Sequence, residues 1–468
     1  MKLEQEKIIV KVKRLLKDKE EKNLIFNIFG AFIIKGVSLF VAFFSMPLYM
    51  KYFGNNKILG VWYTILSILS WITICDLGFG NGLRNKFTEA YSKCEFEKAR
   101  KYISSTYILL IVVICPIIFL GSVLILYFDL NKFFKVSIDI ISSKNFKLGF
   151  FILFLGVCVN FVLKLITSII YAIQKAAINN CISLVTSIIP VCFILIVPDK
   201  GVNINFIALS FIYFIALNIP LIIVSIFIFK KKGLEKCKPN IRDFDFYAAK
   251  QMLNIGLKFF LAQISFMVLM STNEVFIVKL FATDDIVEYS IYYKLFMVVG
   301  SLFMLALTPL WSKITKDLSE RKYYKIKKTN KYLYIISGIA IVIEFLVIPM
   351  LQPIINFWLR EQAIQVNYIT GIVFAIYGSL YILNIVLTTV ANGIGKLTTQ
   401  IYFYGFGAIF KFLGIYLLRY LISEWYVVIL YNCIILFLFC VVQLFWIEKA
   451  IKKIEKLDII GGNKNEFI

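Results

Sequence analysis

The sequence has 468 residues, of which 60% are hydrophobic and 17% are charged, and its mean hydropathy is +0.82. Soluble domains average about 45–50% apolar and about 25% charged residues, so this composition excludes an ordinary soluble protein and indicates one that crosses a membrane many times. Lys and Arg outnumber Asp and Glu by 51 to 28. Because these basic residues concentrate in alternate loops, the excess indicates contact with a membrane surface and not with nucleic acid.

The chain begins with 23 strongly charged residues, MKLEQEKIIVKVKRLLKDKEEKN, which lack the apolar core of a signal peptide. They predict a basic cytoplasmic helix at the membrane surface or, alternatively, a solvated tail that only orients the chain. Apolar stretches of about 20 residues follow, each long enough for the roughly 30 Å hydrocarbon core. Twelve spans are predicted, at 24–48, 58–80, 105–128, 148–170, 177–197, 204–229, 255–280, 287–310, 332–350, 367–390, 400–421 and 425–447.

Basic residues are distributed unevenly between the loops. The termini and the loops after even-numbered spans hold 36 of the 51 Lys and Arg residues. Cytoplasmic loops carry such an excess, so both termini are predicted to be cytoplasmic. The excess charge is expected to face anionic lipid head groups, which makes membrane lipids an expected partner.

The largest cytoplasmic loop, 231–254, divides the chain into bundles at 24–230 and 255–447, with a cytoplasmic tail at 448–468. Three pairs of short segments match between the halves: KYFGNN with KLFATD, LRNKFTEA with LWSKITKD, and AIQK with GIGK, at offsets of 228, 227 and 221 residues. Duplication explains these matches; chance similarity between basic loops is the alternative. Duplication predicts an all-α integral membrane protein of about 12 transmembrane helices, in two six-helix bundles related as parallel repeats.

A glycine-rich segment, CDLGFGNGLRNK, ends the second span at residues 75–86. A dinucleotide-binding loop needs a preceding strand, which this span does not provide. The spacing of Gly78 and Gly82 favours close helix packing. Together with Gly80 these glycines weaken the helix by about 1 kcal/mol each relative to alanine, which suits a hinge. Arg84 and Lys86 then lie where a lipid phosphate would enter from the cytoplasm.

The segment DLGFGNGLRNKFTEA (76–90) resembles the lipid-linked oligosaccharide flippases of bacterial O-antigen and capsule pathways. These form the polysaccharide-transport branch of the multidrug/oligosaccharidyl-lipid/polysaccharide (MOP) exporter superfamily. NGIGK (392–396) is similar to a second feature of that group. The resemblance implies two bundles that move an undecaprenyl-pyrophosphate-linked oligosaccharide repeat unit across the inner membrane, from the cytoplasmic to the periplasmic leaflet. It also implies a cation-lined cavity, H⁺ or Na⁺ as the coupling ion, and a polymerase and glycosyltransferases as pathway partners.

Charged residues within spans are costly and usually functional. Lys35 and Lys411 lie in the middle of spans one and eleven, where they are predicted either to line a cavity that binds the diphosphate or to pair with a carboxylate on another span.

Glu274 and Lys294 are predicted at similar depths on neighbouring spans. Glu274 is the predicted ion-coupling residue, with Lys294 holding it in one state or binding substrate; a static salt bridge is the alternative. Asp76 either caps the glycine turn, pairs with Arg84 or binds the coupling ion. Weaker candidates are Lys164, Lys258, Arg419 and Glu344.

No histidine, CxxC pair or ligand-spaced cluster of Cys, Asp and Glu is present in the sequence, so neither a metal site nor an organic cofactor is predicted. No catalytic residues are predicted either, because the sequence shows no acid pair or nucleophile constellation. A multidrug or cation antiporter of the same superfamily is the first alternative, although Lys and Arg outnumber Asp and Glu inside the spans, which favours an anionic substrate. A membrane oligosaccharide polymerase is the second alternative, disfavoured by a longest outer loop (129–147) that is short and without arginine.

Overall fold

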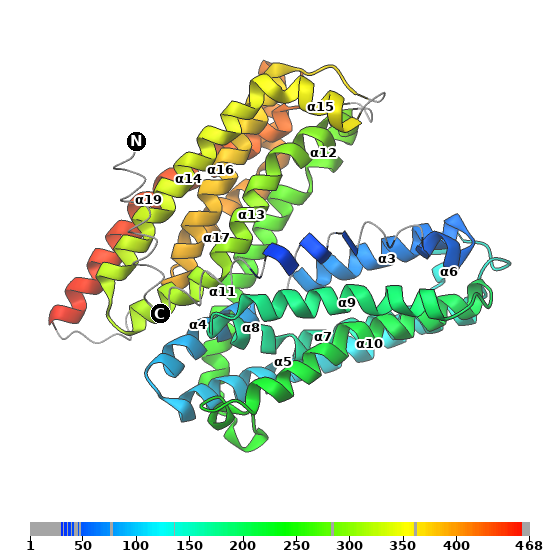
Figure 1. The fold of residues 1–468 in the computed structure, drawn as a ribbon, viewed down its shortest axis with the longest axis horizontal. Coiled ribbons are helices and arrows are strands. Elements are labelled where there is room, and N and C mark those ends of the chain that lie inside the picture. Colours follow the sequence, from blue (N-terminus) through cyan, green and yellow to red (C-terminus); the bar gives the residue numbers. More distant parts are fainter. Residues whose placement is uncertain are drawn as a thin grey trace. The chain divides into compact units, whose positions relative to one another are not determined.

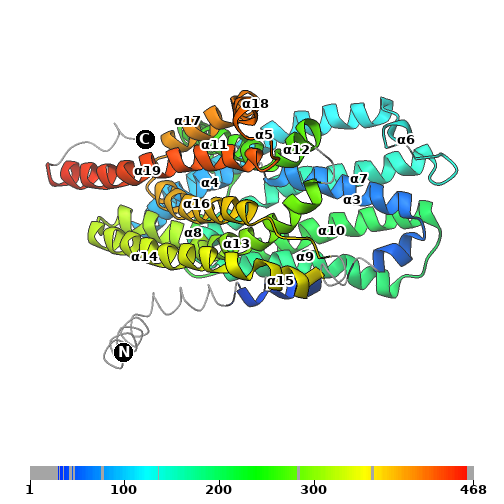
Figure 2. The same cartoon turned by 90° about the horizontal axis from the view of Figure 1, so that it is seen from above.

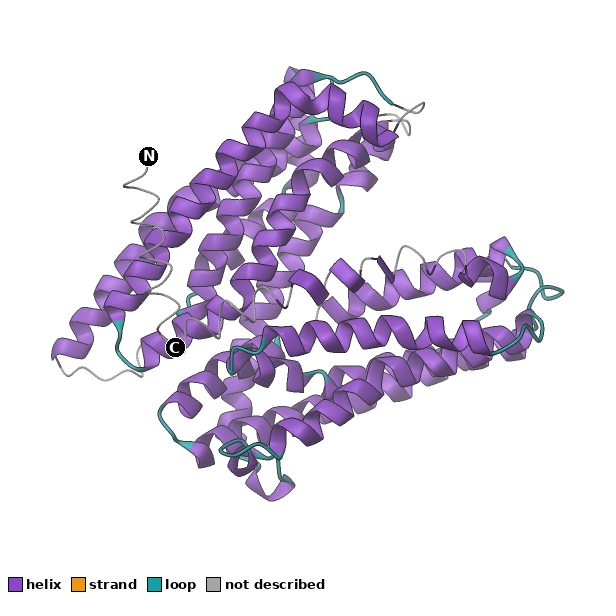
Figure 3. Ribbon diagram, in the orientation of Figure 1, coloured by secondary structure: helices purple, strands orange, loops and turns teal. Residues whose placement is uncertain are grey.

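The computed structural model describes residues 30–460 except for 31, 35, 39, 42–44, 46–47, 75–77, 135, 282–284 and 360–362. The described residues form helices, turns and loops but no strand (Figure 3). The prediction of an all-α membrane protein is therefore confirmed. The predicted basic segment 1–23 lies outside the described residues, as does the end of the predicted tail.

The chain divides into two compact units, Met1–Gly256 and Leu257–Ile468. Helix α11 (Phe246–Ser271) begins within the predicted linker. Asp245 explains this start, because its Oδ1 accepts a hydrogen bond from the backbone N of Ala248 at 2.8 Å. Ser105 fixes the same turn by accepting from the Asp245 N and donating to its O.

In the N-terminal unit, residues 48–53 are helical. Helix α7 packs against α3, α5 and α10, while α8 continues α7 and packs against α4. Asn160 of α7 donates to the Leu217 O at 2.9 Å, and Asn218 of α10 donates to the Gly156 O at 3.1 Å. These hydrogen bonds from asparagine side chains join α7 to α10, as polar side chains commonly join helices inside membranes. The unit contains α3 (Asn56–Ile74), α4 (Phe79–Ser92), α5 (Phe96–Tyr127), α6 (Leu130–Phe133), α7 (Ser143–Leu163), α8 (Leu165–Ala172), α9 (Ala176–Ile196), α10 (Val202–Phe229), η1 (Glu235–Cys237) and η2 (Ile241–Asp243) (Figure 1).

In the C-terminal unit the central helix is α16, which is the most buried of the described candidate spans and packs against α13, α14 and α19 (Figure 2). Helix α19 extends through the first part of the predicted tail, where Glu455 pairs with Lys327 of α14 at 2.6 Å. The unit contains the end of α11, α12 (Asn273–Leu280), α13 (Asp285–Ser319), α14 (Tyr323–Val347), η3 (Ile348–Met350), α15 (Leu351–Leu359), α16 (Tyr368–Gly393), α17 (Thr398–Ile409), α18 (Lys411–Leu421) and α19 (Val427–Ile460).

The same turns recur at equivalent places in the two units. After α8, Gln174 has a φ of 61° and the Lys175 N donates to the Ile170 O at 3.0 Å. After α16, Gly395 has a φ of 74° and the Lys396 N donates to the Ala391 O at 2.9 Å. Both are the left-handed turns that commonly end helices.

A second pair of turns follows α4 and α13. Cys94 and Arg321 have φ values of 60° and 59°. The next residue donates to the Ala90 O in one turn and to the Asp317 O in the other. These turns lie in or beside two of the three segment pairs that match in sequence, so the backbone supports the internal repeat.

Among the described residues nine helices are long and apolar enough to cross a membrane, or ten if α17 and α18 form one span. The predicted first two spans lie partly outside the described residues. Several of these helices expose large apolar side chains, among them Phe119, Leu120 and Leu124 of α5. Such faces suit contact with lipid tails, and the chain is a multi-pass membrane protein.

Candidate functional site

Helices α11 and α12 are separated by one residue, Thr272. A helix end leaves its last carbonyl groups without partners in the helix. The Thr272 Oγ1 donates to the Val268 O at 2.7 Å, which satisfies one carbonyl at the end of α11. The adjacent Leu269 O accepts a hydrogen bond from another span.

That donor is Lys411, the first residue of α18, which follows a 62° bend between α17 and α18. Its Nζ donates to the Leu269 O, to the Thr272 Oγ1 at 3.0 Å and to the Asn273 Oδ1 at 2.7 Å. It also lies 5.4 Å from the centre of the Phe276 ring. The side chain is only 1% exposed, so one ammonium group joins two helix breaks inside the unit.

Two further helices contribute to this cluster. The Asn432 Nδ2 of α19 donates to the Asn273 Oδ1 at 2.8 Å, and the Asn273 Nδ2 donates to the Tyr289 OH of α13 at 3.3 Å. Both asparagines and Tyr289 are buried. We call Lys411, Thr272, Asn273, Asn432 and Tyr289 the lysine cluster.

The lysine cluster holds a basic amine on neutral groups. Every acceptor of the Lys411 Nζ is a carbonyl, hydroxyl or amide oxygen, and no ion pair involves Lys411 in the part of the chain that the structure describes. The end of α11 carries partial negative charge, which favours the ammonium. An anion that approached the cluster would compete with these neutral acceptors for the hydrogen bonds of Lys411. The alternative prediction, a carboxylate partner on another span, is not found among the described contacts of Lys411.

The glycine-rich segment shapes the start of α4 in the N-terminal unit. Gly78 precedes this helix with a φ of 71°, a conformation that strongly favours glycine. Gly80 is buried, and a Cβ on Gly82 would lie 3.1 Å from the Ile255 Cγ2. Gly82 therefore allows α4 to approach α11 at Ile255. Asp76 lies outside the described residues, so its predicted roles stay predictions.

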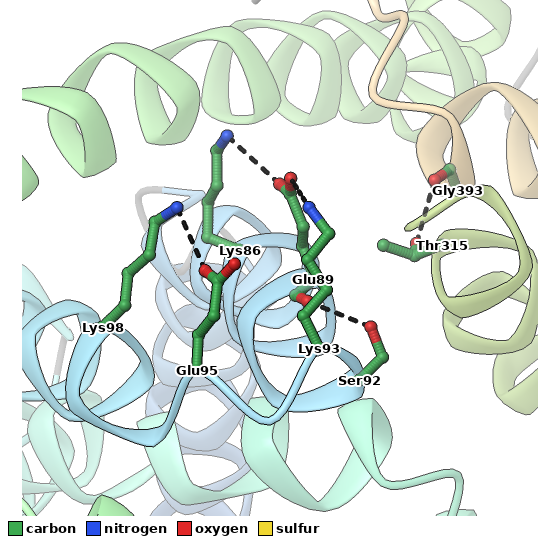
Figure 4. Close-up of polar contacts among 8 residues, drawn as sticks. All are labelled: Lys86, Glu89, Ser92, Lys93, Glu95, Lys98, Thr315 and Gly393. Carbon is green, nitrogen blue, oxygen red and sulfur yellow. Dashed lines mark hydrogen bonds and ion pairs between the residues drawn. The ribbon is translucent and has the colours of Figure 1, made fainter. Parts of the chain in front are cut away.

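The two basic residues of this segment are buried near the same helix end. The Arg84 guanidinium lies 5.0 Å from the Tyr171 ring of α8, and the Arg84 side chain is 3% exposed. The Lys86 Nζ pairs with Glu89 at 3.5 Å, and Glu89 also pairs with Lys93 at 3.0 Å (Figure 4). Both basic residues have partners in this state, and their predicted contact with a lipid phosphate stays a prediction.

Glu274 and Lys294 are both exposed on the surface of the C-terminal unit. Glu274 follows Asn273 in the chain, yet no ion pair joins it to Lys294 where the structure describes the chain. The predicted static salt bridge is therefore not formed in this state, and the coupling role of Glu274 stays a prediction. Lys35 lies outside the described residues.

Sequence reasoning missed the partners of the basic residues. Asn273 and Asn432 each lie in a predicted apolar span, and this polarity is the signal that could have found them. Glu89 is three residues after Lys86, a spacing that places both on one helix face. Among the described residues no group of His, Cys, Asp and Glu is arranged to hold a metal ion.

Matched lysines lie near the repeated turns that follow α8 and α16. The amino group of the neighbouring Lys231, just after α10, together with burial, lowers the pKa of Lys175 to about 8. In the other unit, burial and the charges of Lys258 and Lys453 lower the pKa of Lys396. Both turns therefore concentrate positive charge at one end of their unit.

We expect Lys175 to react unusually fast with amine-acylating reagents at pH 8, because a lowered pKa raises its neutral, nucleophilic fraction. In Lys231→Gln the pKa of Lys175 should move back toward 10.5, so acylation at pH 8 should slow by roughly tenfold. Lys232→Gln is the matched control and should leave the rate unchanged. Peptide mass spectrometry measures the rates, and equal Lys175 rates in both variants would contradict the assigned pair.

The whole fold matches solved transporter structures. A MATE protein in its straight conformation aligns with a TM-score of 0.73 and 14% identity, over 95% of this chain and 98% of that one. A Vibrio cholerae MATE transporter in its bent form gives 0.70 and 11%, over 92% and 98%. A multidrug resistance MATE transporter of the MOP superfamily in its outward-facing conformation gives 0.67 and 14%, over 92% and 96%.

The sequence itself is similar to that of a Yersinia pseudotuberculosis protein named "Putative O-antigen export protein". The two are 24% identical over 331 residues, which are 68% of this chain and 72% of that one. No family model matches the sequence. The chain therefore has the fold of the MATE transporters of the MOP superfamily, and its similarity to a protein named for O-antigen export confirms the resemblance predicted from residues 76–90.

Proposed function

We propose that the protein is a flippase, which moves an undecaprenyl-pyrophosphate-linked oligosaccharide repeat unit from the cytoplasmic to the periplasmic leaflet of a bacterial inner membrane. The observation that carries this proposal is the similarity to a protein named for O-antigen export. The transporter fold supports it, because alternating access between two repeats suits a bulky amphipathic cargo.

The lysine cluster supports an anionic cargo. Lys411 places a basic amine inside the C-terminal unit on neutral acceptors alone, and a diphosphate is a strong acceptor for that amine in its ammonium form. In this proposal the substrate exchanges with the neutral acceptors of Lys411 during the cycle. That exchange would change the contacts at both helix breaks.

Several further features belong to the same proposal. Both termini lie in the cytoplasm, where the basic loops face anionic lipid head groups. An H⁺ or Na⁺ gradient drives the cycle, and no organic cofactor or catalytic step is needed. A polymerase and glycosyltransferases of the same pathway act beside the flippase. The similar proteins described above are named for export and transport, which supports a protein that is not an enzyme.

Export of cationic drugs is the second candidate function. It is favoured by the fold, because solved neighbours include a multidrug resistance transporter. An antiporter for cations would be expected to use acidic groups where the lysine cluster has an ammonium. The basic side chain of Lys411 therefore favours the flippase.

Deleting the gene is expected to leave a pyrophosphate-linked repeat unit on the cytoplasmic side of the membrane. The measurement is a lipid-linked glycan profile in which sugars are separated by their accessibility from each leaflet. Restoring the gene should return the sugar to the periplasmic side. An unchanged profile with new sensitivity to cationic dyes would instead support the drug exporter.

A further inference from the structure

Glu344 of α14 carries a buried carboxyl group. The predicted ninth span, 332–350, places it near the outer end, where a side chain can reach water. The structure instead continues the helix through η3 and α15, so that one candidate span runs from Tyr323 to Leu359. Glu344 lies well inside this segment and is 2% exposed.

Glycine makes room for this carboxyl group on the neighbouring helix. A Cβ on Gly378 of α16 would lie 3.1 Å from the Glu344 Cδ, 3.1 Å from its Oε2 and 3.2 Å from its Oε1. The carboxyl group thus lies against the α16 backbone. Gly371, seven residues earlier on the same face of α16, similarly makes room for Leu351 of α15. This face of α16 is shaped to fit α14 and α15 closely.

The carboxyl group has no polar partner in the described part of the chain. Its Oε1 is fully buried without a hydrogen bond, and no hydrogen bond or ion pair to either oxygen is formed there. A buried ionised carboxylate without a partner is very costly, and such a group normally becomes neutral instead. A bound metal cation would need several oxygen ligands, which these contacts do not supply.

Charged groups on the packed elements do not compensate Glu344. Helices α16 and α15 and the η3 turn carry no charged residue at their described positions. On α14 itself the nearest charge is Lys331, about 20 Å away along the helix axis. On α13, Glu288 accepts a hydrogen bond from Trp425, and Lys294 is exposed. The remaining charges of α13 lie at its two ends, at Asp285, Lys313, Lys316 and Asp317.

The titratable tyrosines of α16 are also directed elsewhere. Tyr377 donates its hydroxyl to the Met270 Sδ at 3.0 Å, and the Tyr381 ring stacks on Phe266. Both contacts are with α11, whereas Glu344 belongs to α14. Tyr368 is at the exposed first turn of α16.

We propose that Glu344 is a proton-binding site of the C-terminal unit, occupied when α14 and α16 are packed as in this structure. Its carboxylate takes one proton from water to form the neutral acid, and it returns that proton when the α14–α16 contact opens and water reaches the group. This inference rests on the proposed function in one respect, because it makes H⁺ the coupling ion of the transport cycle. It assigns that ion to Glu344 rather than to Glu274.

Infrared difference spectroscopy of the full-length protein in lipid vesicles tests the site directly. At neutral pH the wild type is expected to show the carbonyl band of a protonated carboxylic acid, and Glu344→Gln should lose that band. Glu424→Gln removes an exposed carboxylate from a loop of the same unit and should retain the band. An identical band in all three proteins, or its absence from the wild type, would overturn the proposal.

A second measurement avoids variants that fail to fold. Dicyclohexylcarbodiimide modifies protonated carboxyl groups in apolar surroundings, so the wild type should be labelled at Glu344, and labelling should slow as the pH rises. Peptide mass mapping identifies the position, and labelling confined to other carboxyl groups would contradict the site.

Flipping assays separate this inference from the proposed function. If Glu344 is protonated but the vesicles do not move the lipid-linked oligosaccharide, the proton site stands and the flippase proposal fails. If the wild type flips its cargo and Glu344→Gln keeps the full stimulation by a proton gradient, the flippase proposal stands and the coupling role of Glu344 fails.

Discussion

Replacing Lys411 by methionine is expected to slow flipping by about tenfold or more while leaving the protein folded. Methionine retains a flexible stem but removes the ammonium that joins both helix breaks. A hydrogen bond to a charged group contributes about 1.5–3 kcal/mol, and a change of about 1.4 kcal/mol in the barrier alters a rate tenfold. Thermal unfolding should shift little, because an apolar side chain of similar length avoids the desolvation cost of a buried basic group, which offsets the lost hydrogen bonds.

Lys449→Met is the matched control, because Lys449 is exposed on α19 of the same unit. It should flip at the wild-type rate. Initial flipping rates and thermal unfolding are measured on the same vesicle preparations. A parallel loss of rate and thermal stability in Lys411→Met would show that Lys411 only supports the fold, and an unchanged rate would remove it from the cycle.

The second large effect is expected at the contact between α13 and α16. A Cβ on Gly393 would lie 2.8 Å from the Ile314 Cγ2, 2.9 Å from its Cβ and 3.1 Å from the Trp311 O. The Thr315 Oγ1 also donates to the Gly393 O at 2.9 Å (Figure 4). Because backbone atoms meet here, Gly393→Ala must separate the two helices and should destabilise the protein by about 1–3 kcal/mol.

Gly338→Ala provides the comparison for this substitution. Gly338 is also helical, in α14 of the same unit, and a Cβ there has no atom within 4 Å. Alanine should be neutral or stabilise α14 by up to about 1 kcal/mol. Thermal unfolding in detergent measures both variants. Equal unfolding temperatures for the two variants would contradict the close contact at Gly393.

Hydropathy predicts where the spans lie because burial in lipid imposes a long apolar run. The predicted spans 204–229 and 367–390 agree with α10 and α16 within a few residues. The loop matches AIQK and GIGK also predict a shared structure, and both segments form the same left-handed turn. A few short segments were therefore enough to predict the repeat, because a turn restricts the choice of residues more strongly than a helix does.

The helix breaks could not be predicted in the same way. Helices α11 and α17 end just before Thr272 and Phe410 without proline, whereas Pro116 and Pro309 lie inside continuous helices. These breaks depend on tertiary contacts such as the one between Lys411 and the Leu269 O. Sequence patterns place Lys411 inside a span, but its neutral partners come from residues more than 130 positions away in the chain.

Glu344 was placed among the weaker candidates for a related reason. Its apparent closeness to the membrane surface depended on the end of the predicted span, and Pro349 and Pro353 favour an early end. The structure continues through a 3-10 turn, which moves the same carboxyl group into the interior. When the predicted end of a span differs from the structure by a few turns, the set of charged residues that are candidates for coupling changes as well.

The most direct test of the central claim is flipping by the purified protein in lipid vesicles that contain a pyrophosphate-linked oligosaccharide. A membrane-impermeant glycosidase added outside measures the accessible sugar. With an imposed ion gradient, the account predicts that sugar initially on the inner leaflet becomes accessible only when the protein is present, and more slowly with Lys411→Met. If the accessible sugar stays limited to the outer-leaflet fraction under H⁺ and Na⁺ gradients of either direction, the protein is not a flippase for this lipid.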